Sequence, residues 1–205
     1  MTEPDPGSLT APKPAGSEEP HHEAPPKEQR RVLLGIIPMW VAEVVVILVA
    51  AFVLALLVQQ FIVKPFAIPS PSMENTLLEG DRVLVNRLVY HFHPPHRGDV
   101  IVFHPPGTVS KDPFIKRVVA VGGDTIAVHN GDLYLNGVAQ DEPYVKEHPI
   151  DGEYPETKIA SGFVWAMGDN RNNSGDSRVF GPVPLSSIMG EAFAIYWPLN
   201  RIHGL

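Results

Sequence analysis

The stretch DTIAVHNGDLYLNGVA, residues Asp124 to Ala139, holds short β-forming runs that are separated by two Asn-Gly pairs. Asn130-Gly131 and Asn136-Gly137 favour type I′ turns, because both central residues of that turn need a positive φ. The valine, isoleucine, tyrosine and leucine between the turns favour extended strands. The stretch therefore predicts antiparallel strands that are joined by tight hairpins.

Runs of the same character lie on both sides of this stretch. Each is short, is rich in β-branched or aromatic residues, and is bounded by Gly, Pro, Asn or Asp. These runs are DRVLVNRLVY (81–90), GDVIVFH (98–104), FIKRVVAV (114–121), GFVWAMG (162–168) and GEAFAIYW (190–197). We therefore expect a mainly β fold, an antiparallel-sheet domain over residues 62–205.

Residues 1–38 and 39–61 differ sharply from the strands that follow. The first segment is dominated by Pro, Glu, Ala, Gly and Ser, which predicts a disordered tail in which His21 and His22 are solvated. The second is apolar over the roughly 20 residues that a helix needs to cross a bilayer. The sequence thus predicts three parts: a disordered tail, a membrane anchor helix and a β-rich domain.

The apolar segment predicts an uncleaved anchor rather than a cleaved signal sequence. Its run is longer than the core of a signal sequence, about 7–15 residues, and its exit VQQFIVKPF lacks a small-x-small cleavage site. Lys27, Arg30 and Arg31 precede the span and only Lys64 follows it closely, which places the tail in the cytoplasm and the β domain outside. We interpret Glu43, near the cytoplasmic end, as a detail of the anchor.

The composition excludes several classes of function. The formal net charge is -7 with no basic stripe that would follow a phosphate backbone, so we expect no nucleic-acid partner. The chain has no cysteine, which excludes a disulfide framework, thiol catalysis and cysteine-bound metal.

Two serines lie in SPSMENTL, residues 70–77, soon after the apolar segment. Ser70 and Ser72 flank Pro71, a composition that is common in turns. A serine at this place is also a candidate nucleophile at the outer face of the membrane, although no Gly-x-Ser-x-Gly elbow surrounds either one. These residues alone are compatible with both interpretations.

Lys116 lies inside the strongly β-forming run FIKRVV. Strand alternation places it on one face with Phe114 and Val118, and Arg117 on the other face. A lysine that is buried on an apolar face has a depressed pKa and can act as a general base near neutral pH. The alternative is a lysine that extends its amine to solvent at a sheet edge.

The polar stretch GDNRNNSGDSR, residues 168–178, stands between two apolar runs. A calcium loop would place Arg171 at a ligand position and lacks the closing glutamate, which argues against calcium. The stretch is compatible with an Asx-rich turn, or with a loop whose Ser174, Asp176 and arginines orient a buried base. We interpret the histidines of HFHPPH (91–96) as a surface loop, and expect no metal or cofactor.

Together, the anchor and the motifs IPSPSMENTL, RGDVIVF, FIKRVVAVGGD and GDNRNNSGDSR resemble the bacterial type I signal peptidases, peptidase family S26. The resemblance covers roughly residues 40–197. It implies a membrane-anchored serine endopeptidase of the β fold shared with LexA-like proteins, which cleaves signal peptides from exported preproteins after a small-x-small motif. It also implies a place in the bacterial plasma membrane, with the bilayer, signal peptides and the export machinery as partners.

The resemblance also implies roles at matching positions. Ser72 corresponds to the nucleophile and Lys116 to the general base, while the Ser70 hydroxyl and the Ser72 N–H form the oxyanion hole. Residues that support the lysine and its loop are Ser174, Asp176 and Arg178. Shallow pockets for small side chains would be lined by Phe66, Ile68, Met73, Leu77, Val102, Phe114 and Ile115. The chain departs from the family at Pro71, where a small residue is usual, and at Asn75, where proline is frequent.

Two other functions are compatible with parts of the sequence. A non-catalytic β domain that is tethered to the membrane as an adaptor would share the anchor and the strands, but would not require Ser72 or Lys116. A self-cleaving Ser/Lys protein of the LexA type would need an internal scissile bond, and Ala15-Gly16 lies across the expected membrane from Ser72.

Overall fold

The structure is a computed structural model that describes residues 38–107 and 112–205. The predicted disordered tail, with His21 and His22, lies outside the described residues except at its last position.

The helix α1 covers Met39–Phe61, the range that its hydropathy predicts to be helical. Its stretch Met39–Gln59 is long and apolar enough to cross a membrane. At 1.5 Å per residue these 21 residues extend over about 32 Å, close to the thickness of the hydrocarbon core of a bilayer.

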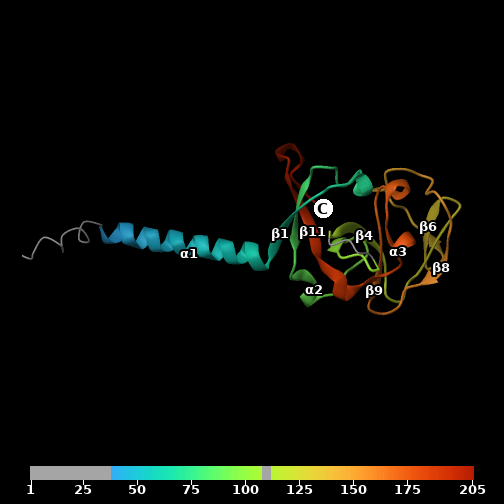
Figure 1. The fold of residues 1–205 in the computed structure, drawn as a ribbon, viewed down its shortest axis with the longest axis horizontal. Helices are drawn as coiled ribbons and strands as arrows, with labels where there is room; N and C mark the ends of the chain where they lie inside the picture. Colours follow the sequence, from blue (N-terminus) through green and yellow to red (C-terminus); the bar gives the residue numbers. More distant parts are fainter. Residues whose placement is uncertain (1–37, 108–111) are drawn as a thin grey trace, which may run out of the picture. The chain divides into compact units, whose positions relative to one another are not determined.

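The residues after the helix form two antiparallel sheets, which confirms the predicted fold class (Figure 1). The larger sheet has the strand order β1-β2-β11-β3-β4-β9-β10, and β12 pairs with β11. Its strands are β1 (Val63–Ala67), β2 (Arg82–Asn86), β3 (Val100–Phe103), β4 (Phe114–Val121), β9 (Phe163–Met167), β10 (Val183–Pro184), β11 (Ile188–Trp197) and β12 (His203–Gly204). Short helical turns connect them: η1 (Pro71–Met73), α2 (Val89–Phe92), η2 (Arg171–Asn173), α3 (Ser177–Phe180), η3 (Leu185–Ser187) and η4 (Leu199–Arg201).

The smaller sheet contains the hairpins that the sequence predicts. Its order is β7-β6-β5-β8, with β5 at Thr125–His129, β6 at Asp132–Leu135, β7 at Val138–Ala139 and β8 at Tyr154–Lys158. Asn130 and Asn136 have φ values of 53° and 52°, and the glycine after each is also at positive φ. Both Asn-Gly turns therefore have the backbone that a type I′ hairpin requires.

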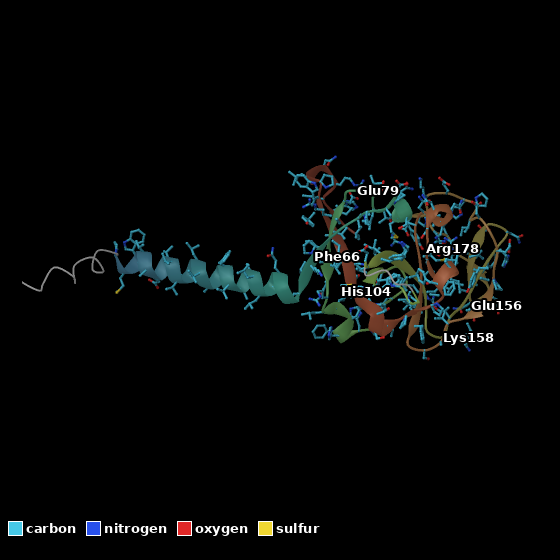
Figure 2. The ribbon with its side chains drawn as sticks, viewed as in Figure 1. Phe66, Glu79, His104, Glu156, Lys158 and Arg178 are labelled. Atoms are coloured by element: carbon cyan, nitrogen blue, oxygen red, sulfur yellow. The ribbon has the colours of Figure 1, made fainter. Side chains whose placement is uncertain are left out.

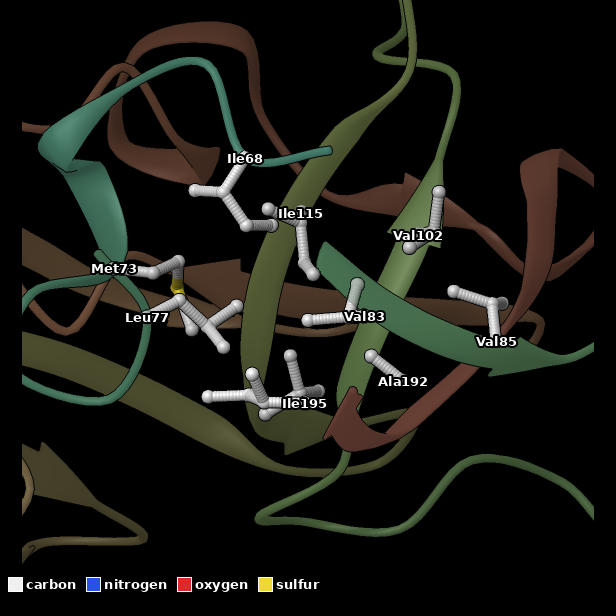
Figure 3. Close-up of a cluster of buried hydrophobic side chains, with 10 residues drawn as sticks. Ile68, Met73, Leu77, Val83, Val85, Val102, Ile115, Ala192 and Ile195 are labelled. Carbon is white, nitrogen blue, oxygen red and sulfur yellow. The ribbon is translucent and has the colours of Figure 1, made fainter. Parts of the chain in front are cut away.

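Three buried clusters hold the domain together, and two of them bear on the position of the site. One joins the sheets and consists of Val119, Ala120, Ile126, Val128, Leu133, Leu135, Ile150, Ile159, Trp165 and Met167. The second lies on the larger sheet and includes Met73, the last residue of η1, and Leu77, which follows it (Figure 3). Neither side chain has exposed surface. The segment that carries Ser72 is thus fixed by apolar side chains on its C-terminal side.

Several elements differ from the sequence-based prediction, and the short strands β1, β10 and β12 lie outside the predicted runs. The run 81–90 is a strand only as far as Asn86, whose side-chain oxygen accepts a hydrogen bond from Leu88 N and ends the extended segment; α2 follows. The strand β8 was not predicted, because its sequence YPETK is polar. It lies at a sheet edge, where proline is tolerated, and its Glu156 and Lys158 are exposed (Figure 2).

Candidate active site

Ser72 lies in the middle of the short turn η1, whose backbone is restrained by a proline and a hydrogen bond. Pro71 at the first position fixes φ, and the Glu74 N–H closes the turn on the Pro71 carbonyl oxygen. Ser70 precedes the turn in an extended conformation. Ser72 itself is 7% exposed, so its hydroxyl is held in a largely dry position.

Lys116 reaches Ser72 from the strand β4. Its Nζ is 2.7 Å from Ser72 Oγ and also donates a hydrogen bond of 2.9 Å to the Ile115 carbonyl oxygen. The amine lies 5.5 Å from the centre of the Phe114 ring, on the side that strand alternation predicts. Arg117, the next residue, binds Asp169 instead. The lysine is 4% exposed and does not extend to solvent.

Burial lowers the pKa of the Lys116 amine from 10.5 to about 8, although the carboxylates of Asp176 and Asp169 act in the opposite direction. Desolvation disfavours the charged ammonium, and this effect is larger than the stabilisation of the ammonium by the two carboxylates. A substantial fraction of the amine is therefore neutral at mildly alkaline pH, as a general base requires.

Ser70 and Ser174 are the two other serines that the sequence analysis places in the site. Ser70 Oγ lies 3.3 Å from Ser72 Oγ, so the two hydroxyls face one another. Ser174 Oγ is buried and has no hydrogen-bond partner in the described part of the chain. A β-carbon on Gly168 would come within 2.3 Å of both Ser174 Oγ and the Ser72 carbonyl oxygen, so only glycine fits between the two serines. The structure thus brings Ser174 beside Ser72 without bonding it to Lys116.

Asp176 and Arg178 hold the loop that follows β9. The buried Asp176 carboxylate accepts hydrogen bonds from Gly168 N and from the backbone and guanidinium of Arg178. Arg178 also donates to the Arg171 carbonyl oxygen at 2.6 Å. Figure 2 shows Arg178 on this loop. The pair therefore ties both ends of the loop together.

An ion pair that the sequence analysis missed fixes the same loop to β4. The guanidinium of Arg117 binds Asp169 in a bidentate manner, at 2.9 and 2.6 Å, and Thr76 donates to the same carboxylate at 2.5 Å. Asp169 has no exposed surface. Because β9 pairs with β4 through Met167 and Arg117, the loop begins next to Lys116. The sequence offered one sign of this ion pair, because Asp169 lies in the polar stretch GDNRNNSGDSR.

A second missed pair lies behind the loop. Arg171 is 1% exposed and Glu142 is 5% exposed, and their side chains meet at 2.5 and 2.7 Å. Arg171 Nε also donates to the Gly168 carbonyl oxygen. Glu142 follows β7 with no motif around it, so the sequence gives no sign of this pairing.

A cavity of about 430 Å³ opens beside the serine and the lysine. It is lined by Pro69, Ser70, Pro71, Ser72, Asp112, Pro113, Phe114, Ile115, Lys116, Asn173 and Gly175. Of the residues that the resemblance assigns to substrate pockets, Phe114 and Ile115 line this cavity. Ile68, Met73, Leu77 and Val102 belong to the buried cluster on the larger sheet (Figure 3). The partly buried Phe66 packs against this cluster.

The histidines of residues 91–96 do not form a metal centre. His91 belongs to α2, and the rings of His93 and His96 are 5.0 Å apart. Within residues 38–107 and 112–205, no group of three His, Cys, Asp or Glu side chains is arranged to hold a metal ion.

These contacts define a class of site. A buried serine hydroxyl contacts a lysine amine with a lowered pKa, beside a second hydroxyl and an open cavity. Such an arrangement can form and hydrolyse an acyl-enzyme without a metal or cofactor, as in Ser/Lys hydrolases.

Comparison with known proteins identifies the family. Residues 41–197 match the family model "Signal peptidase, peptidase S26". The chain is 44% identical to "Probable signal peptidase I-1" of Synechocystis sp. over 79% of this chain and 85% of that protein, and 35% identical to "Signal peptidase IB" of Staphylococcus aureus over 78% and 91%. A solved signal peptidase I from Enterococcus faecalis is 28% identical over 47% of this chain and 95% of that one, with a TM-score of 0.42.

The chain belongs to the signal peptidase family, peptidase S26. Its activity is that of a signal peptidase I, a serine endopeptidase that cleaves signal peptides.

Proposed function

We propose that Ser72 is the nucleophile of this peptidase and that Lys116 is its general base. The observation that carries the proposal is the 2.7 Å contact between Lys116 Nζ and Ser72 Oγ in a buried setting, where the pKa of the amine falls to about 8. A neutral amine at this distance can accept the hydroxyl proton as the oxygen attacks.

The reaction then proceeds in two halves. Ser72 Oγ attacks the scissile carbonyl carbon while its proton moves to Lys116 Nζ, and the tetrahedral oxyanion is stabilised by the Ser72 N–H and the Ser70 hydroxyl. The peptide C–N bond breaks, the leaving amine takes the proton from Lys116, and an acyl-enzyme remains. A water molecule gives its proton to Lys116 and attacks the ester, which releases the new carboxylate and regenerates the Ser72 hydroxyl.

The loop 168–178 has a supporting role in this scheme. Asp176 accepts a hydrogen bond from Gly168 N, and Arg178 donates one to the Arg171 carbonyl oxygen, so the two residues hold the loop closed. The closed loop keeps Gly168 next to the Ser72 carbonyl oxygen. In the acyl-enzyme Lys116 no longer has the Ser72 hydroxyl as a partner. The buried and unpaired Ser174 Oγ, which lies beside Gly168, then supplies a hydrogen bond to the amine.

The substrate is an extended peptide with small side chains at positions −1 and −3 before the cut. Among the described strands, β1 pairs only with β2, so its other edge is open to an added strand. Phe114 and Ile115 give the cavity beside Ser72 an apolar wall. Buried Ile68, Met73, Leu77 and Val102, with Phe66, form the packed layer behind the serine turn and limit the depth available to substrate side chains.

We also propose the orientation in the membrane. α1 is the single anchor in the bacterial plasma membrane, the tail is cytoplasmic, and the β domain faces outward, where signal peptides emerge from the export machinery. Lys27, Arg30 and Arg31 on one side of the span support this orientation. Protease added to intact spheroplasts should degrade the β domain and leave the tail; protection of the β domain would reverse the orientation.

The experiment that tests the catalytic assignment is cleavage of a purified preprotein with an Ala-x-Ala site, in detergent. Ser72→Ala and Lys116→Ala should lose cleavage, while their circular dichroism matches that of the wild type. Ser161→Ala and Lys158→Ala, which change exposed residues of the same types, should cleave at the wild-type rate. Equal cleavage by all five proteins would show that neither Ser72 nor Lys116 is catalytic.

A folded wild type that cleaves no such substrate would favour the non-catalytic adaptor. The buried amine of Lys116 argues against that function, because a lysine without a catalytic task is an expensive occupant of an apolar site.

A further inference from the structure

Asn170 makes contacts with the serine turn that neither the catalytic scheme nor the ion pairs of the loop explain. Its backbone N–H donates to the Ser72 carbonyl oxygen at 3.2 Å, and its side-chain Nδ2 donates to the Pro71 carbonyl oxygen at 3.1 Å. Nδ2 is also 3.5 Å from a carboxylate oxygen of Glu74. Asn170 is 3% exposed, so these bonds are shielded from water.

The two contacts hold consecutive carbonyl groups of the nucleophile turn. Pro71 has no N–H, so the turn cannot be fixed through a donor at that position. The Pro71 carbonyl already accepts the Glu74 N–H, and the Asn170 amide takes a second position on the same oxygen. One residue across the site therefore sets the direction of both carbonyls.

The bond from Asn170 to the Pro71 carbonyl oxygen also affects the Ser72 N–H, because both groups belong to one peptide unit. The Pro71 carbonyl and the Ser72 N–H belong to one planar peptide unit, and in the trans form they point in opposite directions. A bond that fixes the Pro71 oxygen therefore fixes the direction of the Ser72 N–H as well. That N–H is the backbone donor of the oxyanion hole in the proposed mechanism, and no backbone hydrogen bond occupies it in the described part of the chain.

We propose that Asn170 is a positioning residue that aims the Ser72 N–H at the oxyanion. This inference rests on the proposed role of Ser72. The side-chain amide of Asn170 acts on the transition state through the Pro71–Ser72 peptide, without contact to the reacting atoms. The ground-state peptide is bound elsewhere in the cavity and along the strand edge, so Asn170 affects kcat far more than KM.

The expected effect is smaller than the loss of an oxyanion donor, which costs about 100- to 1000-fold in kcat. Asn170→Ala keeps its backbone bond to Ser72 and removes the side-chain bond to Pro71, together with the longer contact to Glu74. We therefore expect a fall in kcat of about 10- to 100-fold, with KM within about twofold. Asn170→Asp has the same shape but no N–H donor, and it should lose at least as much. The pH midpoint of the rate should not change in the alanine variant, because Lys116 keeps its surroundings.

The test compares two ligands of one peptide sequence that ends in alanine, one with a C-terminal aldehyde and one with the matching alcohol. The aldehyde forms a hemiacetal with the serine and places an oxygen in the oxyanion hole, whereas the alcohol does not. Affinities are measured by inhibition of preprotein cleavage and, for weakly active variants, by calorimetry. Because each value is a ratio of two affinities on one sample, it does not depend on the fraction of folded protein.

The wild type should bind the aldehyde much more tightly than the alcohol, and Asn170→Ala should lose about 10-fold or more of this preference while the alcohol binds as before. Asn172→Ala is the control: this exposed neighbour donates its side-chain amide to Pro149, away from Ser72, and should keep the full preference. An unchanged preference in Asn170→Ala, or an equal loss for both ligands, would overturn the inference. A wild type with no preference would instead overturn the assignment of Ser72, and this inference with it.

Discussion

Replacing Lys116 with methionine should abolish activity and yet stabilise the protein, by an amount that depends on pH. Burial lowers the pKa of the amine from 10.5 to about 8 in the folded chain. Below pH 8 the native state must carry a buried ammonium that the unfolded chain exposes to water. Since the folded pKa is lowered, the unfolded chain binds more protons between pH 8 and 10.5, and the free energy of unfolding rises with pH across that window.

The magnitude follows from the pKa shift. A difference of about 2.5 units corresponds to about 3 kcal/mol of destabilisation at pH 7, and the same linkage relation leaves about 1 kcal/mol at pH 9.5. Methionine removes this penalty but also removes the bonds from Nζ to Ser72 and to the Ile115 carbonyl, each worth about 1 kcal/mol. The gain of Lys116→Met should therefore be about 1 to 3 kcal/mol at pH 7 and smaller by about 2 kcal/mol at pH 9.5.

The assay is urea unfolding of the full chain in detergent at pH 7 and pH 9.5, followed by circular dichroism. Lys158→Met removes a lysine that is exposed on β8, and it should show no such pH-dependent gain. The reasoning would be refuted if the stability difference between wild type and Lys116→Met did not shrink as the pH rises.

Two further predictions concern the loop after β9. Gly168→Ala should lower the cleavage rate at least tenfold, because the new methyl group would lie 2.3 Å from the Ser72 carbonyl oxygen and displace the nucleophile, whereas Gly204→Ala, with only an ordinary contact, should cleave normally. A wild-type rate in Gly168→Ala would show that the turn and the loop are not in close contact. Glu142→Ala should lower the free energy of unfolding by about 3–5 kcal/mol, because it leaves Arg171 charged and buried without its partner. The double variant Glu142→Leu with Arg171→Met should recover most of the lost free energy of unfolding, as measured by urea titration. A double variant as unstable as Glu142→Ala would show that the unpaired charge of Arg171 is not the cause of the loss.

Local sequence patterns predict much of the fold because their causes are local. The Asn-Gly pairs at 130 and 136 require positive φ, and FIKRVVAV coincides with β4 over residues 114–121. The apolar helix follows directly from its hydropathy. The strand β8 could not be predicted, because an edge strand with one neighbour needs neither an apolar face nor an N–H on every residue.

The site was predictable only in part, for a similar reason. Ser72, Lys116 and the polar loop have recognisable motifs. Alternation along β4 places the lysine on an apolar face, but does not decide whether its amine is buried or extends to solvent. The buried partner of Arg171 is Glu142, 29 positions away with no pattern around it. Likewise, the double contact from Asn170 to the serine turn depends on the tertiary packing of two loops almost 100 positions apart.

The most direct test of the Ser72–Lys116 pair is the pH dependence of kcat/KM for the wild type, with a peptide substrate that has no ionisable side chain near the cut. If Lys116 with a pKa of about 8 must lose its proton before Ser72 can attack, log kcat/KM should rise by about one per pH unit below pH 8 and level off above it. Between pH 7 and pH 9 the rate should increase about tenfold. A profile that stays flat from pH 6 to pH 9 would contradict the assignment of Lys116 as the base.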